Sequence, residues 1–154
     1  MEFSNHRYEH IDTKTIKIEV NIDDMSAELL GHLMDKLISE GANDVYYIPI
    51  YMKKNRPAIM LQILCHEEKL NKLKNIIFTE TTTFGLRYFP LEVHRLERRF
   101  SSLNTTWGPV TIKEGLFQGK VVQRSPEYDD CKKISSKANI PLKDVYANVW
   151  KKLP

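Results

Sequence analysis

The chain has 154 residues, of which 42% are hydrophobic and 28% are charged, and its formal net charge is +3. This length and composition are typical of a globular domain with a small appendage, and the charge permits an anionic ligand without requiring nucleic acid. No apolar run approaches the roughly 18–20 residues that span a bilayer, and because the N-terminus is polar we expect no signal peptide there. The two cysteines, Cys65 and Cys131, have no metal-like spacing, which favours a reduced, cytoplasmic setting.

The first part of the chain predicts two strands around a helix. Residues 1–14 are expected to be a flexible lead-in, and alternating apolar residues predict a half-buried strand over 15–22. Apolar residues then recur with helical spacing over 29–38, and Gly41 is expected to end that helix. A second strand is expected over 44–52, where an internal proline favours an edge position.

The next segment predicts a strand, a helix and a further strand. The nearly all-apolar stretch 58–66 is expected to be a central strand, the acids at 67–68 open a helix, and 80–85 is its exit. A fourth strand is expected over 86–93. The order βαββαβ predicts an α+β fold with a ferredoxin-like core over 15–95, in which two helices cover one face of a four-stranded antiparallel sheet.

Beyond this core, residues 96–154 predict a β extension followed by two C-terminal helices. A turn is expected at 107–109. Ser125 and Pro126 are expected to cap and begin the first of these helices, because proline suits the first helical position. A break at 139–141 is expected to separate that helix from the last one.

The predicted topology brings several polar clusters to one edge of the sheet. If the strand order across the sheet is fourth, first, third and second, the first two strands and the second helix all end there. That edge would carry two carboxylates, three cations and three hydroxyls: Asp23, Asp24, Lys53, Lys54, Arg56, Thr81, Thr82 and Thr83. Lysine and arginine bind phosphate oxygens, and carboxylates hold Mg²⁺ beside substrate phosphates. The pattern therefore predicts a site for a metal–nucleoside triphosphate complex.

Each cluster also has a purely structural interpretation. Asp23 or Asp24 can cap the first helix, and the basic turn can be a solvated connection that protects an edge strand. The threonines can satisfy carbonyls at the end of the second helix, and the acids at 127–130 can belong to the first turn of a helix. Cys131 is expected to be a small buried hydrophobe rather than a nucleophile.

Four stretches of the chain resemble the C-terminal domain of the LarC family of nickel-insertion proteins. They occur in the family's order and at similar intervals: 21–25 (NIDDM), 49–57 (PIYMKKNRP), 77–87 (IFTETTTFGLR) and 126–131 (PEYDDC). The resemblance covers about residues 16–150. Asn55 and Ala58 stand where the family has glycines around its Arg-Pro pair, and asparagine tolerates the left-handed backbone of such a turn.

The resemblance implies a CTP-dependent nickel insertase of the lyase class. Proteins of this family insert nickel into pyridinium-3,5-bisthiocarboxylate mononucleotide, which gives the nickel-pincer nucleotide cofactor of lactate racemase and related enzymes. The reaction converts CTP to CMP and pyrophosphate and needs Mg²⁺ or Mn²⁺. The C-terminal domain is the part linked with CTP, so the family's larger N-terminal domain is an expected partner.

Candidate roles follow for individual residues. Lys53, Lys54 and Arg56 are the expected catalytic phosphate-binding residues, and Asp23 and Asp24 are the first candidates for metal contacts. Asp129 and Asp130 are further metal candidates. The candidates for contacts with the nucleotide are Thr81, Thr82, Thr83, Arg87, Glu127 and Tyr128.

Two other functions stay open at this point. The chain can be a non-catalytic nucleotide-binding or oligomerisation module that needs the N-terminal domain for activity. The lysine-rich segment 132–152 can mimic a helix-turn-helix, but Asp129, Asp130 and Asp144 dilute its charge, so neither a nucleic-acid partner nor a membrane is expected. An uncovered sheet face and the apolar edge at 46–48 predict a homo-oligomer.

Overall fold

The computed structural model describes residues 7–153, so the first six residues of the lead-in predicted over 1–14 lie outside the described residues. The described chain divides into two compact units. The core unit is Asp12–Val93, and the extension unit consists of residues 7–11 together with 94–153. The elements in chain order are β1 (His10–Ile22), α1 (Ala27–Ser39), β2 (Asp44–Met52), β3 (Arg56–His66), α2 (Leu70–Glu80), β4 (Arg87–Arg95), β5 (Glu97–Thr105), β6 (Gly108–Phe117), β7 (Lys120–Pro126), α3 (Tyr128–Ala138) and α4 (Leu142–Lys152).

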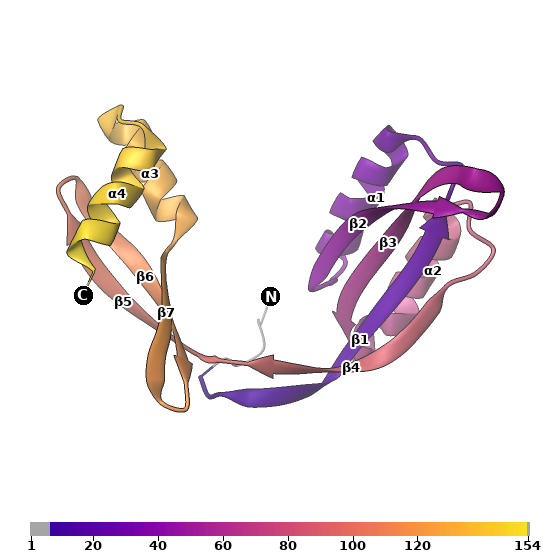
Figure 1. Ribbon diagram of the computed structural model, residues 1–154, viewed down its shortest axis with the longest axis horizontal. Coiled ribbons are helices and arrows are strands. Elements are labelled where there is room, and N and C mark those ends of the chain that lie inside the picture. The colour runs from indigo at the N-terminus through magenta and orange to yellow at the C-terminus, as the bar shows by residue number, and fades with distance from the viewer. Residues whose placement is uncertain (1–6, 154) are drawn as a thin grey trace. The chain divides into compact units, whose positions relative to one another are not determined.

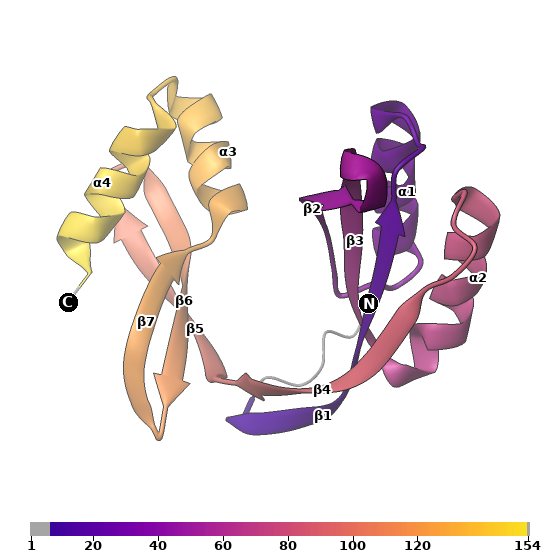
Figure 2. The same cartoon turned by 45° about the vertical axis from the view of Figure 1, so that its right-hand side comes forward.

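The core unit has the predicted ferredoxin-like arrangement. Its four-stranded sheet has the order β2-β3-β1-β4, and β3 is antiparallel to both of its neighbours. The arrows of β1 and β4 also point in opposite directions (Figure 1). Thus β2 is an edge strand and β3 is central, as the internal proline of β2 and the apolar run of β3 predict. Helices α1 and α2 lie on the same face of this sheet (Figure 2).

Alternation along the strands explains how this core closes. Every second residue near the end of β1 and in the middle of β3 faces the helices and is buried, and each helix contributes an apolar stripe with helical spacing. The central members of the cluster are Ile18, Val20, Ile22, Leu33, Leu37, Leu61, Ile63, Cys65, Leu73 and Ile77. Gly41 follows α1 with a φ of 105°, a backbone conformation that favours glycine, so the helix ends where expected.

Two strand boundaries differ from the sequence prediction. Strand β1 begins at His10 rather than Thr15, although residues 10–14 show no apolar alternation. Backbone pairing between strands requires no apolar side chains, so this early part of the strand has no signal in the sequence. Strand β3 begins at Arg56 rather than Ala58, because Arg56 pairs with Met52 of β2 directly beyond a short 3-10 turn over Lys53–Asn55.

The extension unit packs two helices against a small sheet. Its strands have the order β5-β6-β7, with turns at 106–107 and 118–119. The centre of its core is formed by β6, α3 and α4: Val110, Ile112, Cys131, Val145 and Val149. Burial raises the pKa of the Cys131 thiol, in agreement with its predicted role as a small hydrophobe.

The predicted start of the first C-terminal helix is wrong. Pro126 is the last residue of β7 rather than the first of a helix, because it pairs with Ile112. The backbone N–H of Glu127 then donates to the carbonyl of Thr111 at 2.8 Å, so the ladder continues to Glu127 and α3 begins at Tyr128. Trp150, which lies on α4, is half exposed. Within residues 7–153, no helix is long and apolar enough to cross a membrane.

Candidate functional site at one end of the core sheet

Three connections of the core unit meet at the same end of its sheet. One follows β1, one joins β2 to β3, and one leads from α2 to β4 (Figures 1 and 2). They carry the polar clusters that the sequence predicted to share an edge. We call this end the rim and define it by Asp23, Asp24, Lys53, Lys54, Arg56, Thr81, Thr82 and Thr83.

Direct contacts join these three connections. The Arg56 guanidinium donates to the Asp23 carboxylate with an Nη1–Oδ2 distance of 3.3 Å. The Thr82 hydroxyl donates to the Asp24 carboxylate. The two adjacent aspartates therefore hold the basic turn on one side and the threonine loop on the other.

The aspartates of the rim do not cap α1. Ser26 has an extended backbone at the N-cap position, and its Oγ accepts a hydrogen bond from the Leu29 N–H at 3.4 Å. The structural interpretation of Asp23 and Asp24 as helix caps is therefore wrong. Both carboxylates stay at the exposed surface, where a ligand reaches them.

The basic turn presents two lysines to solvent. Lys53 and Lys54 are exposed, and neither has an ion-pair partner among the described residues. Lys54 and Asn55 have φ values of 62° and 54°, a left-handed conformation that is rare for lysine and tolerated by asparagine. Within residues 7–153 the turn thus keeps two adjacent cations available for an anion, and Asn55 suits its left-handed backbone.

The three threonines of the rim have different partners. The Thr81 hydroxyl donates to the Ile77 carbonyl at 2.7 Å, so the helix-end interpretation holds for this residue. The Thr83 hydroxyl donates to the Gly85 carbonyl at 2.7 Å and organises the loop locally. Thr82 is the threonine whose side chain reaches a carboxylate of another connection.

Arg87 lies beside the rim in a polar cluster that the sequence analysis missed. Its Nε donates to Glu19 at 2.8 Å and its Nη2 to Asn21 at 3.2 Å, while Gln62 Nε2 donates to the other Glu19 oxygen at 2.9 Å. The Arg87 hydrogen bond holds the pKa of Glu19 below its ordinary value. Residues 19, 21 and 87 all lie on the sheet face that points away from the helices. The alternation of β1, which buries residues 18, 20 and 22, could therefore have indicated that residues 19 and 21 share this face.

The candidates near residue 130 belong to the extension unit rather than to the rim. Asp130 accepts a hydrogen bond from the Thr111 N–H at 2.9 Å, and this contact together with one from the Thr111 hydroxyl lowers its pKa. Glu127 pairs with Lys113 at 3.1 Å, and the Lys132 ammonium lies 5.8 Å from the centre of the Tyr128 ring.

Asp129 lies on an exposed face of α3 that is mainly basic. It lines a shallow concavity of about 670 Å³ with Lys132, Lys133, Ser136 and Lys137. Three ammonium groups beside one carboxylate oppose the binding of a divalent cation. Among the described residues, no group of three or more His, Cys, Asp or Glu side chains is arranged to hold a metal. A metal site at the rim therefore needs oxygens from a ligand beside its two carboxylates.

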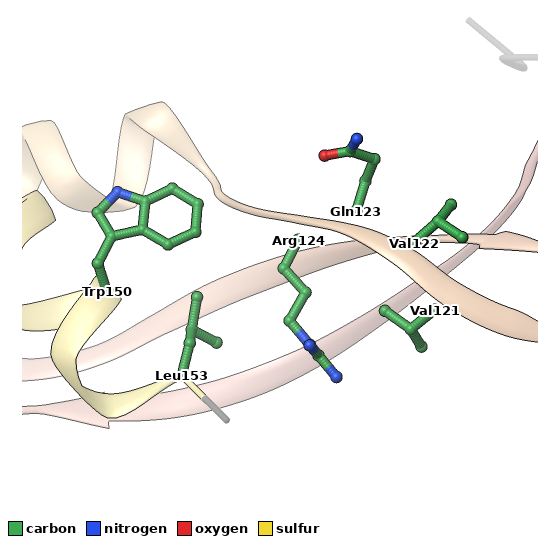
Figure 3. A pocket seen from close by; sticks show the side chains of 6 residues that line it. All are labelled: Val121, Val122, Gln123, Arg124, Trp150 and Leu153. Carbon is green, nitrogen blue, oxygen red and sulfur yellow. The ribbon is translucent and has the colours of Figure 1, made fainter.

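A cleft in the extension unit contains none of the predicted site residues. It lies between β7 and the end of α4 and has a volume of about 330 Å³ (Figure 3). Its lining residues are Val121, Val122, Gln123, Arg124, Trp150 and Leu153. The half-exposed side chain of Trp150 forms a wall of this cleft.

Comparisons with known proteins agree on one family. A family model described as nickel insertion protein matches residues 4–146. A pyridinium-3,5-bisthiocarboxylic acid mononucleotide nickel insertion protein from Thermotoga petrophila is 45% identical over 140 residues, which are 91% of this chain and 35% of that protein. A protein of the same description from Acetivibrio thermocellus is 46% identical over 143 residues, again 35% of its length. The chain thus spans about a third of these curated relatives.

Solved structures give the same result for the fold. LarC2, described as the C-terminal domain of a cyclometallase involved in the synthesis of the NPN cofactor of lactate racemase, aligns with a TM-score of 0.87 and 35% identity. The alignment covers 93% of this chain and 98% of that domain. A protein from Methanopyrus kandleri aligns with a TM-score of 0.67 and 25% identity over 88% of this chain and 85% of its own.

Proposed function

Because the chain belongs to the nickel insertion protein family, we propose that it forms the nucleotide- and metal-binding C-terminal part of a nickel insertase. The substrate is pyridinium-3,5-bisthiocarboxylic acid mononucleotide, the molecule named in the description of its relatives. Nickel is the inserted metal, and the product is the nickel-pincer nucleotide cofactor. The relatives' remaining two thirds supply the partner domain.

The observation that carries this proposal is the juxtaposition of charges at the rim. Two lysines that have no ion-pair partner within residues 7–153 stand beside Arg56, which contacts Asp23. Lysine supplies point charges and arginine a planar fork, and together they bind the oxygens of a triphosphate. We assign the triphosphate of CTP to this turn, with Arg87 as a further phosphate contact.

The rim fits a divalent cation that is bound together with the nucleotide. Mg²⁺ and Mn²⁺ prefer oxygen ligands, and Mg²⁺ is often held by one or two carboxylates with substrate phosphates supplying the rest. Asp23 and Asp24 are adjacent, exposed and of the required type. When bound, such a cation neutralises phosphate charge. The metal-binding roles of Asp129 and Asp130 stay predictions. Asp130 already accepts a hydrogen bond from Thr111, and three lysines lie beside Asp129.

The proposed chemistry demands positioning rather than covalent catalysis from this unit. An oxygen of the mononucleotide substrate attacks the α-phosphorus of CTP, a new P–O bond forms, and the bond to the β-phosphate breaks. Pyrophosphate leaves with the electron pair of that bond. CMP is released later, when water attacks the same phosphorus and the new P–O bond to the substrate breaks. Lys53, Lys54 and Arg56 orient the phosphates and stabilise the charge that develops on the leaving group.

A thermal-shift panel tests the proposal. We expect CTP with Mg²⁺ or Mn²⁺ to raise the melting temperature of the chain, because a ligand that binds the folded state stabilises it. ATP, GTP and UTP serve as comparison nucleotides. Lys53→Ala should abolish most of the shift and leave the melting temperature without ligand unchanged. Lys120→Ala, which changes an exposed lysine at the start of β7, is the matched control.

The outcomes separate the proposal from its main alternative. A shift without release of pyrophosphate, even after addition of the N-terminal domain, would make the chain a non-catalytic nucleotide-binding module. No shift with any nucleotide would contradict a formed nucleotide site at the rim. A full CTP shift in Lys53→Ala would remove that residue from the site.

A further inference from the structure

The loop between α2 and β4 presents an aromatic side chain entirely to solvent. Phe84 has a relative exposure of 106%, the highest among the large hydrophobic side chains of residues 7–153. Single exposed apolar residues are common on protein surfaces, so exposure alone decides nothing. The position of Phe84 in a loop of the rim is the second observation.

Hydrogen bonds on both sides of Phe84 hold its loop in place. The Thr83 hydroxyl donates to the Gly85 carbonyl at 2.7 Å and accepts from the Gly85 N–H at 3.3 Å. Thr82, two residues before the phenylalanine, is bound to Asp24. The ring is therefore carried by a loop that is anchored to Asp24, one of the two proposed metal-binding carboxylates.

Phe84 and the basic turn lie toward opposite edges of the same sheet end. The turn joins β2 to β3, whereas Phe84 precedes β4, and the order β2-β3-β1-β4 places about two and a half strand spacings between them. At about 4.8 Å per spacing, this separation is about 12 Å. It is comparable with the length of an extended nucleoside triphosphate, and Asp23 and Asp24 follow the strand between the two features.

We infer that Phe84 is the stacking surface for the heterocyclic ring of the nucleotide whose phosphates bind the turn at Lys53–Arg56. This inference rests on the proposed function. An aromatic face stacks on any planar base, so Phe84 adds affinity without selecting cytosine. The ring is the cytosine of CTP or the pyridinium of the mononucleotide substrate, because both present a planar π face.

Calorimetric titrations with and without a ring on the ligand test this role. For Phe84→Ala we expect the affinity for Mg²⁺–CTP to fall about 5- to 150-fold, the range for one base–aromatic stack. The affinity for inorganic tripolyphosphate, which has no ring, should not change. Phe84→Trp should retain CTP affinity. Phe78→Ala, which removes a half-exposed phenylalanine from α2, is the matched control.

A second ligand identifies which ring is stacked. Nicotinate mononucleotide carries a pyridinium ring, so a loss of affinity confined to this probe assigns the pyridinium to Phe84, whereas a loss confined to CTP assigns cytosine. In the Phe84→Trp variant, quenching of the introduced indole's emission by the ring-bearing ligand but not by tripolyphosphate would support the same role. Unchanged affinity of Phe84→Ala for both nucleotides overturns the inference. If the unmodified chain binds neither CTP nor tripolyphosphate, the proposed nucleotide site itself fails.

Discussion

At the scale of single residues, Lys54 of the basic turn carries a positive charge on a backbone conformation that is unfavourable for lysine. Lys54 has a φ of 62°, and the left-handed conformation costs an L-residue with a side chain roughly 1–2 kcal/mol. Strained residues of this kind cluster at ligand-binding positions. The strain therefore fits a lysine that is kept for its charge rather than for stability.

We expect Lys54→Gly to raise the free energy of unfolding by about 0.5–1 kcal/mol, because glycine adopts a positive φ without steric conflict. The same variant should bind CTP more weakly. Lys53→Gly is the control, since the backbone at Lys53 has no positive φ and glycine there should destabilise. Chemical denaturation and calorimetry measure both quantities, and a loss of stability in Lys54→Gly would contradict the argument from strain.

Asp130 is a second residue whose structural and functional roles can be separated. We expect Asp130→Ala to lower the free energy of unfolding by about 1–2 kcal/mol, because the Thr111 N–H loses its charged acceptor. CTP affinity should be unaffected if the metal site consists of Asp23 and Asp24. Asp129→Ala, at the exposed neighbouring position, should change neither quantity.

The pH dependence of Asp130 follows from the direction of its pKa shift. The Thr111 contacts lower the pKa from the ordinary value of 3.8. The unfolded chain therefore binds the proton more readily, so the stabilisation is complete above about pH 4 and disappears as the pH falls through the lower, folded-state value. The difference in stability between the unmodified chain and Asp130→Ala should narrow over that acidic range.

At the scale of elements, different residues near the N-terminus of α1 cap the helix and form the candidate site. Ser26 supplies the cap, so Asp23 and Asp24 are not needed for it. We expect Ser26→Ala to reduce stability by about 1 kcal/mol and leave CTP affinity within about twofold. Asp24→Asn should weaken the binding of CTP and leave the stability nearly unchanged. A large loss of nucleotide affinity in Ser26→Ala would show that the helix start and the rim are one functional feature.

The strands show where sequence patterns succeed and where they fail. Alternation predicted the part of β1 from Thr15 to Ile22, because side-chain burial on one face of a sheet produces a period of two. The strand predicted over 44–52 coincides with β2. The start of β1 at His10 and the inclusion of Pro126 in β7 escaped prediction. Both depend on pairing with a neighbouring strand, which leaves no apolar pattern in the local sequence.

At the scale of the whole molecule, the core unit leaves one sheet face without a helix of its own. Edge strand β2 exposes Ile48, and uncovered edges of this kind favour association. We expect the chain to be a homo-oligomer and Ile48→Lys to shift it to a smaller species in light-scattering chromatography. Val122→Lys, which changes an exposed valine of the extension unit, is the control. A monomer at every concentration would contradict this expectation.

The sequence by itself determined which residues form the two helices and most of the strands of the core, because local periodicity and turn chemistry depend on near neighbours. It also predicted the strand order, since few topologies cover a four-stranded sheet with two helices. The tertiary structure decided which polar groups touch. Arg56 contacts Asp23 across 33 positions, Thr82 contacts Asp24 across 58 and Arg87 contacts Glu19 across 68.

These contacts depend on the pairing of strands and on side-chain conformation, neither of which is encoded in any short stretch of sequence. The same reason explains why Asp23 and Asp24 looked equally suited to a helix cap and to a ligand site. Only the folded chain shows that Ser26 takes the cap and that both carboxylates face other connections of the rim.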